Sequence, residues 1–344
     1  MTDPLVARLA PRDYREVARY VIGAPTYEWI RSGSGDGFAS DNEAAFSRRR
    51  LRSRVLVDVA SVSTATTVLG APIAAPVMIG PMGLQRAVHP DGELAMAEGA
   101  ARAGSLLVVA VNATTSIEDI AAAQPGLPLW FQLYNWGDRD ALAGIIGRAE
   151  AAGVRAIVPL VNTAVDVNHT SPQIGFRLPA TAKFAHFDSS PENTGSNTWE
   201  YLSWLRSVTS LPIVPKGIMT GDDAARAVDA GASGIIVSNH GGRQLERSIS
   251  TLDALPEVVA GAGNLEVYLD GGVRTGGDIL VALALGARAV LVGRPAMWGL
   301  AVGGADGVAR VLDTFRQELA DDAGLCGLAD ATAVPRDIVV DAAG

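Results

Sequence analysis

Short apolar runs alternate with longer alanine-rich stretches along the chain from about residue 74 onward. The short runs are rich in β-branched residues, and the longer ones repeat their apolar positions at helical spacing, which together indicates repeated βα units. Eight runs have the character of strands: residues 76–79, 106–111, 129–134, 156–160, 212–215, 234–238, 267–270 and 289–292. Helices are expected after most of them, for example over residues 92–103, 139–152, 221–230 and 276–285.

Eight parallel strands that are each followed by a helix close into a barrel, so the predicted fold class is α/β, a (β/α)8 TIM barrel. An open, doubly wound sheet is the alternative for the same alternation. We expect one domain over residues 1–344, with the barrel over 74–325. Residues 1–73 predict one or two helices and then an irregular segment, 50–70, that covers the barrel bottom.

A stretch rich in Pro, Ser, Thr and Asn, residues 165–197, follows the fourth predicted strand. It is too long for an ordinary βα loop. We therefore predict that it forms a lid over an active site at the carboxyl ends of the strands.

Composition narrows the class of protein further. The chain has 48% apolar and 19% charged residues with a net charge of −9, which describes a globular protein with a large core and argues against a nucleic-acid partner. A single cysteine, Cys326, indicates a reducing compartment and excludes an internal disulfide. The charged start of the chain and the absence of a long apolar run predict no signal peptide and no membrane span. We expect a cytoplasmic protein without a metal site, because no His, Asp and Glu residues have metal-ligand spacing.

The densest polar cluster follows the sixth predicted strand, at residues 238–244, SNHGGRQ. A lone histidine is more often structural than catalytic. His240, however, follows a barrel strand and has glycines beside it, which let the backbone approach a ligand, so we predict that it is catalytic. After the fifth strand, Lys216 is either a solvated loop residue or a cation for an anionic cofactor, and position alone leaves both open.

Glycines and arginines end the last two strands, in the strings DGGVR and GRP. Exposed backbone N–H groups, the positive end of a helix and guanidinium groups together make a phosphate pocket. Barrels commonly bind phosphate after these two strands. The alternative is that the glycines only turn the chain.

Six strings, in this order and one per barrel strand, resemble the FMN-dependent 2-hydroxy-acid oxidases and dehydrogenases, a family that includes glycolate, lactate and hydroxymandelate oxidases. They are PVMIGPMGLQRAVHPDGE, FQLY, LPIVPKGI, GIIVSNHGGRQL, LDGGVRTGGD and VGRP. The resemblance covers about residues 27–325. It implies FMN as cofactor, a small-molecule substrate, oxygen or another oxidant as electron acceptor, and a homotetramer.

The resemblance also implies roles for individual residues. His240 is the base, Arg243 pairs with the substrate carboxylate, and Tyr134 hydrogen-bonds the substrate oxygen. Lys216 places a cation beside the flavin pyrimidine edge. The remaining implied cofactor contacts are Met82, Gly83, Leu84, Gln132, Ser238, His240, Asp270, Gly271, Gly272, Arg274, Gly293 and Arg294.

The sequence departs from the family mainly around the substrate. Asn162 stands where the family has an aspartate that supports the histidine, and the string 166–169, DVNH, lacks a second carboxylate-binding arginine. Arg177 is a candidate replacement for that arginine. Trp29, Asn112 and Leu160 replace the usual tyrosine, tryptophan and threonine, and Ala110 replaces a serine. Because these changes spare the flavin contacts, we interpret them as a re-specified pocket.

Three functions compete on this sequence. The first is oxidation of a 2-hydroxy acid. The second is other flavin chemistry on the same barrel, either oxidation of an amine, non-carboxylate or carrier-bound substrate, or an isomerase reaction. The third is flavin binding without turnover, against which the retention of His240, Arg243, Tyr134 and Lys216 argues.

Overall fold

A computed structural model describes residues 13–33, 38–136, 138–165, 175–177, 179, 182–187 and 197–342. Within them a parallel barrel is formed by the strands β4 (Val77–Ile79), β5 (Leu107–Ala110), β6 (Leu129–Leu133), β7 (Ile157–Pro159), β8 (Lys216–Ile218), β9 (Gly234–Val237), β10 (Glu266–Asp270) and β11 (Ala289–Val292). Their order is β7-β6-β5-β4-β11-β10-β9-β8. Parallel bridges from Ile157 to Ile213 and from Leu160 to Lys216 join β7 to β8 and close the ring. The predicted barrel is confirmed and the open sheet is wrong.

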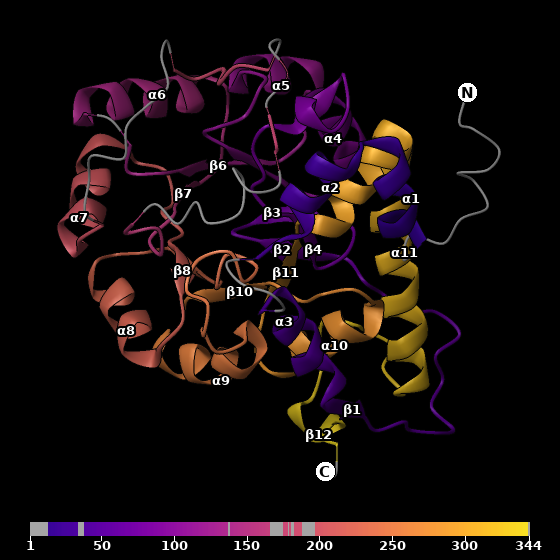
Figure 1. The fold of residues 1–344 in the computed structure, drawn as a ribbon. Coiled ribbons are helices and arrows are strands. Elements are labelled where there is room, and N and C mark those ends of the chain that lie inside the picture. The colour runs from indigo at the N-terminus through magenta and orange to yellow at the C-terminus, as the bar shows by residue number, and fades with distance from the viewer. Residues whose placement is uncertain are drawn as a thin grey trace.

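One helix follows each barrel strand and packs outside the ring (Figure 1). These helices are α4 (Gly92–Arg102), α5 (Ile117–Ala123), α6 (Arg139–Ala151), α7 (Trp199–Val208), α8 (Gly221–Asp229), α9 (Thr251–Gly261), α10 (Gly276–Ala284) and α11 (Arg294–Leu325), the last kinked at Gly303 and Gly304. Several begin where a side-chain oxygen accepts a hydrogen bond from the third backbone N–H of the helix, as Thr220 does for α8 and Ser250 for α9. The sequence thus marks these helix starts locally.

The fifth barrel strand differs from its prediction. Residues 212–215 were expected to be the strand, with Lys216 after it, yet regular pairing begins at Lys216. Pro212 and Pro215 have no N–H to donate to a ladder, so the preceding segment makes only isolated bonds, such as Val214 N–H to the Ile157 carbonyl at 2.9 Å. Lys216 is therefore part of the barrel wall.

The chain before the barrel contains three described helices, where one or two were expected: α1 (Tyr14–Val21), α2 (Ala24–Arg31) and α3 (Phe38–Ser47). The segment expected to be irregular includes the end of β1 (Arg49–Leu51), which pairs with β12 (Val339–Asp341) after the short η4 (Arg336–Ile338), and the start of the hairpin β2 (Thr66–Val68) and β3 (Ala71–Ile73). The hairpin was missed because its two strands are only three residues long.

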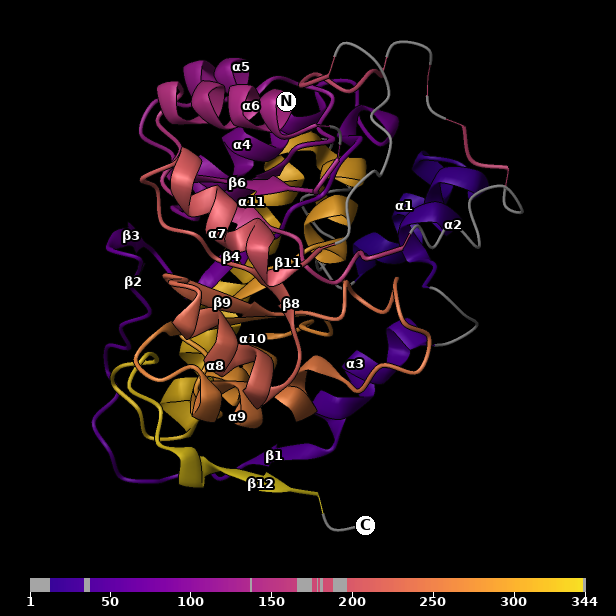
Figure 2. The ribbon, with the colours of Figure 1, turned by 90° about the vertical axis from the view of Figure 1, so that its left-hand side faces the viewer.

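The N-terminal elements lie at both ends of the barrel (Figure 2). Val68, Ala71 and Ile73 of the hairpin pack with residues inside the barrel, including Trp130 and Tyr268. The helices α1 and α2 lie at the opposite end, where α1 packs against α11 and α2 reaches the carboxyl ends of the strands. Among the described residues, the hairpin therefore fills the first end of the barrel and leaves the second end open.

Candidate active site

A cavity of about 1150 Å³, its open mouth included, lies at the carboxyl ends of the barrel strands. Most residues predicted for the site line it: Trp29, Met82, Gly83, Asn112, Gln132, Tyr134, Lys216, His240, Arg243, Asp270, Gly271, Gly272, Arg274, Gly293 and Arg294. The wall also includes Leu160, which stands where the family has a threonine, and the apolar residues Leu291 and Met297, which were not predicted as contacts. A polar, largely cationic ring is thus combined with apolar surface, as is typical of small-molecule sites.

His240 lies in a strained turn at the end of β9. Its φ angle is 60°, in the left-handed region, and Gly241 and Gly242 follow with φ of 64° and 75°. The backbone N–H of His240 donates to Ser238 Oγ at 3.1 Å, and that of Gly242 donates to Asn239 Oδ1 at 3.2 Å. A non-glycine residue persists in this conformation only when its surroundings hold it there, and such residues cluster at functional sites.

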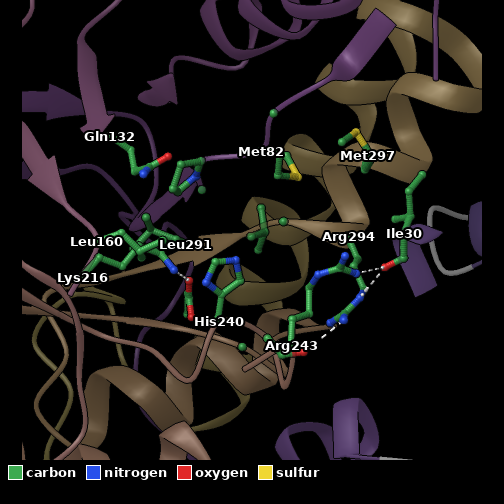
Figure 3. A pocket seen from close by; sticks show the side chains of 18 of the residues that line it. Ile30, Met82, Gln132, Leu160, Lys216, His240, Arg243, Leu291, Arg294 and Met297 are labelled. Atoms are coloured by element: carbon green, nitrogen blue, oxygen red, sulfur yellow. Dashed lines mark hydrogen bonds and ion pairs between the residues drawn. The ribbon is translucent and has the colours of Figure 1, made fainter. Parts of the chain in front are cut away.

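The imidazole of His240 lies between Lys216 on one side and Arg243 and Arg294 on the other (Figure 3). Burial, followed by the positive charges of Lys216, Arg243 and Arg294, holds the pKa of His240 well below its usual range. Its Nδ1 is buried and has no hydrogen-bond partner among the described residues. At neutral pH the ring is therefore uncharged and can accept a proton.

Lys216 is buried, with 4% of its surface exposed. Its Nζ lies 2.6 Å from Asp270 Oδ2 and donates to Ser238 Oγ at 2.7 Å. The sequence left open whether Lys216 is a solvated loop residue or a cation for an anionic cofactor. In the structure it is a buried cation at the cavity wall.

Arg243 and Arg294 both reach the C-terminal end of α2. Arg243 Nη1 donates to the carbonyls of Trp29 at 2.7 Å and Ser32 at 2.8 Å, and Arg294 Nε donates to the Ile30 carbonyl at 3.0 Å. Burial lowers the pKa of Arg243, and burial together with Arg243 and Arg274 lowers the pKa of Arg294 to about 9. Both guanidinium groups stay charged at neutral pH, and α2 carbonyls hold them at the cavity.

The predicted phosphate pocket contains one glycine turn, at Gly271 and Gly272, and one open helix end. Gly271 and Gly272 have φ of 92° and 89°, so both need glycine. The N-cap of α11 is Gly293, which makes no side-chain cap, whereas the first N–H groups of α10 are closed by a capping box of Thr275 and Asp278. The α11 end is thus the better anion site.

Arg274 was also predicted to hold phosphate. It lines the cavity, but its Nη2 forms a 2.8 Å ion pair with Glu43 of α3. A carboxylate therefore already balances part of its charge.

Four predicted contacts do not line the cavity. Asn162, expected to support His240, donates from Nδ2 to the carbonyl of Ser238, two residues before the histidine, at 3.0 Å, and its Oδ1 is buried without a hydrogen-bond partner among the described residues. Ser238 Oγ accepts a hydrogen bond from Lys216 Nζ at 2.7 Å. Leu84, with φ of 59°, donates its N–H to the Asn112 carbonyl at 3.2 Å. Arg177 is exposed and donates to the Phe176 carbonyl.

Much of the predicted lid, residues 166–174, 178, 180–181 and 188–196, lies outside the described residues, and so does the DVNH string at 166–169. The described part includes Phe176, which stacks on Trp29 with ring centroids 4.4 Å apart. His186 is also described. Its Nδ1 contacts the Val111 carbonyl at 2.8 Å and its Nε2 accepts from Ile117 N–H at 2.9 Å, so this histidine is structural.

The residues of the cavity fit a flavin mononucleotide. Gln132 Nε2 and Asp270 Oδ1 are buried without a hydrogen-bond partner among the described residues. Buried polar groups are normally paired, and both residues line the cavity. A ligand with a polar ring edge and hydroxyl groups would satisfy them, while the Gly293 helix end and Arg294 suit its phosphate.

Sequence reasoning missed two buried residues that shape the site. Glu93 of α4 accepts hydrogen bonds from Gln85 N–H at 3.2 Å and Thr114 N–H at 2.9 Å, and so ties the loop after β4 to the loop after β5. Asn42 of α3 hydrogen-bonds Asn239, beside His240, at 2.8 Å. Nothing local in the sequence indicates either link, because each depends on a contact between distant segments.

Within the described part of the chain, no three His, Cys, Asp or Glu side chains gather as metal ligands, and no helix is long and apolar enough to cross a membrane. A closed (β/α)8 barrel with an uncharged histidine, a buried lysine and an open helix N-terminus at its mouth is typical of one class, the flavin-dependent barrel oxidoreductases.

The particular family follows from comparison with known proteins. Residues 18–341 match the family described as FMN-dependent dehydrogenase, and the chain belongs to this family. It is thus an FMN-dependent oxidoreductase whose relatives are hydroxy-acid oxidases.

Two relatives and one solved structure illustrate the similarity. The chain is 42% identical to L-lactate oxidase from Nostoc sp., over 89% of this chain and 91% of the relative. It is 40% identical to 2-hydroxyacid oxidase 1 from Homo sapiens, over 95% of both chains. A crystal structure of mandelate oxidase with benzoyl-formic acid superimposes with a TM-score of 0.91 at 40% identity, covering 97% of this chain and 98% of the other.

Proposed function

We propose that this chain oxidises a 2-hydroxy acid to the 2-oxo acid, with His240 as the base. The observation that carries the proposal is the placement of an uncharged, buried imidazole and the Arg243 guanidinium in one cavity with Lys216. A general base must be unprotonated, and a carboxylate needs a cation. Relatives named as lactate, 2-hydroxyacid and mandelate oxidases support this substrate class.

The reaction removes two electrons and two protons from the CH–OH group. Bound FMN would take up both electrons and the second proton. His240 accepts one proton, Arg243 binds the carboxylate, and Tyr134 hydrogen-bonds the substrate oxygen. Gln132, Lys216 and Asp270 would hold the flavin, with Gly293 and Arg294 at its phosphate. Lys216 supplies positive charge where negative charge develops on reduction, which stabilises the reduced cofactor.

The substrate we propose is larger than glycolate or lactate. The family's second carboxylate-binding arginine is missing from the string at 166–169, and a charge-assisted hydrogen bond contributes about 1.5–3 kcal/mol. Trp29 lines the cavity and stacks on Phe176, so an aromatic wall is available to bind an extended substrate instead.

Anaerobic stopped-flow reduction of the bound flavin tests substrate size. We expect mandelate to bleach the flavin faster than glycolate or lactate at equal concentration. Fast bleaching by glycolate would show that the proposal of a larger substrate is wrong, but it would remain consistent with oxidation of a 2-hydroxy acid.

The role of His240 is tested by His240→Asn, because asparagine tolerates the left-handed φ at this position. The variant should bind FMN and stay yellow, and its rate of flavin reduction should fall about 10²–10⁴-fold. His89→Asn, at a histidine outside the cavity, is the control and should bleach at the parental rate. An unchanged rate in His240→Asn would exclude it as the base.

A second candidate is oxidation of a 2-hydroxy compound that lacks a free carboxylate. The Arg243 guanidinium already donates to the Trp29 and Ser32 carbonyls, which favours neutral acceptor groups around it. Mandelamide and methyl mandelate distinguish the two: if either bleaches the flavin faster than mandelate does, the second candidate replaces the first.

We further propose a cytoplasmic homotetramer that passes its electrons to oxygen or another oxidant. A lone, buried cysteine suits a reducing compartment, and the tetramer rests on the family resemblance. Light scattering during gel filtration should give four times the 35.6 kDa chain mass, and an oxygen electrode identifies the acceptor.

A further inference from the structure

Asn42 is a buried amide on the N-terminal helix α3, with 1% of its surface exposed. Its side chain exchanges two hydrogen bonds with Asn239, which lies at the end of the barrel strand β9. Asn42 Nδ2 donates to Asn239 Oδ1 at 2.8 Å, and Asn239 Nδ2 donates to Asn42 Oδ1 at 2.9 Å. A reciprocal pair of this kind fixes the position and rotation of both amides.

Asn239 is the residue before His240, and its amide holds the histidine turn together. Asn239 Oδ1 also accepts from Gly242 N–H at 3.2 Å, and Asn239 Nδ2 also contacts the Ile249 carbonyl at 3.3 Å. Asn239 thus closes a loop around His240, whose φ of 60° is costly to maintain. Asn42 anchors that closing residue.

Asn42 also lies directly beneath the glycine turn of the phosphate pocket. A Cβ on Gly271 would lie 2.8 Å from Asn42 Nδ2, and a Cβ on Gly272 would lie 2.4 Å from the Asn42 carbonyl oxygen. One residue, from a segment that is not part of the barrel, therefore contacts both the histidine turn and the phosphate turn.

We propose that Asn42 is a positioning residue for the reaction, which sets the orientation of the His240 imidazole through Asn239. The inference rests on the proposed role of His240 as the base. It assigns the N-terminal helix α3 a part in catalysis, although no atom of Asn42 lines the cavity.

The test compares two variants of α3 as holoenzymes. Asn42→Ala removes the amide pair, whereas Phe46→Leu perturbs another buried residue of the same helix and leaves the pair intact. With saturating FMN and substrate, the limiting rate of flavin reduction should fall about 100-fold in Asn42→Ala, because a displacement of about 1 Å at a reacting group has that effect. The rate in Phe46→Leu should stay within about twofold of the parent.

Two further measurements separate positioning from loss of stability. The chain has four histidines, so histidine-selective ¹⁵N NMR of the FMN-free protein can follow each ring, with His240→Asn assigning the signal. Asn42→Ala should shift the His240 signal, and Phe46→Leu should not. In a double-mutant cycle, Asn239→Ala should add little to the rate loss of Asn42→Ala, since both remove one interaction.

Parental reduction rates in Asn42→Ala, an equal loss in Phe46→Leu, or additive losses in the cycle would overturn the proposal. Failure of the underlying function has a different signature. If His240→Asn reduces its flavin normally while the NMR shift in Asn42→Ala is still observed, His240 is not the base, although Asn42 orients it.

Discussion

Lys216 and Asp270 form an ion pair that passes over the strand between them. Lys216 Nζ lies 2.6 Å from Asp270 Oδ2, although β9 separates β8 from β10 in the barrel. The lysine also donates to Ser238 Oγ, directly after β9, at 2.7 Å, so side chains from three neighbouring strands meet at one ammonium group. Both charged side chains are largely buried, at 5% and 15% exposed. Each is therefore tolerated only because the other is present.

A double-mutant cycle on this pair should be strongly non-additive. Lys216→Met and Asp270→Asn should each lower the free energy of unfolding by about 3–5 kcal/mol, because each leaves the remaining polar partner poorly compensated. The combined variant should recover most of that loss. Urea unfolding of the FMN-free protein measures all four species, and additive losses would show that the two side chains do not stabilise one another.

A second prediction concerns pH and uses His186, the structural histidine. Burial lowers its pKa in the folded protein, as burial and nearby cations lower that of His240. Below the ordinary histidine pKa of about 6.5 the unfolded chain thus binds protons that the folded chain resists. The stability contributed by the two neutral histidine rings is fully present above a pH of about 6.5. It is lost as the pH falls toward the pKa values that these rings have in the folded protein.

His186→Gln isolates this effect, because glutamine cannot be protonated. The variant should have the lower Tm at pH 8, since it loses a ring that accepts from Ile117 N–H and packs on Phe131. The difference from the parent should shrink between pH 6.5 and pH 5. A difference in Tm that is constant over this range would show that the ring takes up protons equally in the folded and unfolded states, so that burial does not lower its pKa.

The barrel could be predicted from sequence because its signals are local. Strand and helix alternate in composition, and the strand ends that carry Gln132, His240 and Asp270 follow directly from the strand positions. The fifth strand was displaced by a few residues because Pro212 and Pro215 interrupt pairing, which an apolar run does not reveal.

The supporting contacts could not be predicted. Asn42 meets Asn239 across 197 residues of chain, and no periodicity marks such a pair. For Asn162 the position was predicted but the hydrogen bond was not. The residue aligns with an aspartate that supports the histidine, yet its amide donates to the Ser238 carbonyl. A carboxylate could not donate there, whereas the Oδ1 of Asn162 is buried and has no hydrogen-bond partner among the described residues.

Glu93 gives a third prediction, because its carboxylate is an acceptor for two buried loops. Its Oε1 accepts from the backbone of Gln85 and Thr114, and its Oε2 accepts from the hydroxyls of Thr114 at 2.6 Å and Thr115 at 3.0 Å. Glu93→Ala would leave two buried N–H groups unpaired and should cost about 3 kcal/mol of stability.

Glu93→Gln is the matched control for this network. Glutamine keeps one carbonyl oxygen for the two N–H groups, and its amide can donate to a threonine hydroxyl that rotates. We expect it to cost about 1 kcal/mol. Thermal unfolding and FMN titration should rank the parent above Glu93→Gln and Glu93→Gln above Glu93→Ala. Equal losses in the two variants would mean that the hydrogen bonds to the loops contribute little.

The last prediction concerns the contact between Gly83 and Asn112 at the cavity wall. A Cβ on Gly83 would lie 2.2 Å from Asn112 Oδ1, and the next nearest atoms also belong to the Asn112 amide. Gly83→Ala should therefore force the Asn112 side chain into the cavity or the loop out of place. Overpacking of this kind costs about 1–3 kcal/mol, and we expect weaker FMN binding together with a lower Tm.

A second substitution should relieve this clash, because the three atoms nearest to the added Cβ all belong to the Asn112 side chain. Asn112→Ala removes every atom within that contact, so the double variant Gly83→Ala, Asn112→Ala should bind FMN more tightly than Gly83→Ala alone. Gly144→Ala is the control for adding a methyl group, because its Cβ would meet nothing within 4 Å in the helix α6. It should keep parental FMN affinity and raise stability by about 0.5–1 kcal/mol. Fluorescence titration of the apoprotein with FMN measures the affinities, and if removing the Asn112 amide does not restore binding, the defect in Gly83→Ala arises from the backbone rather than from the amide.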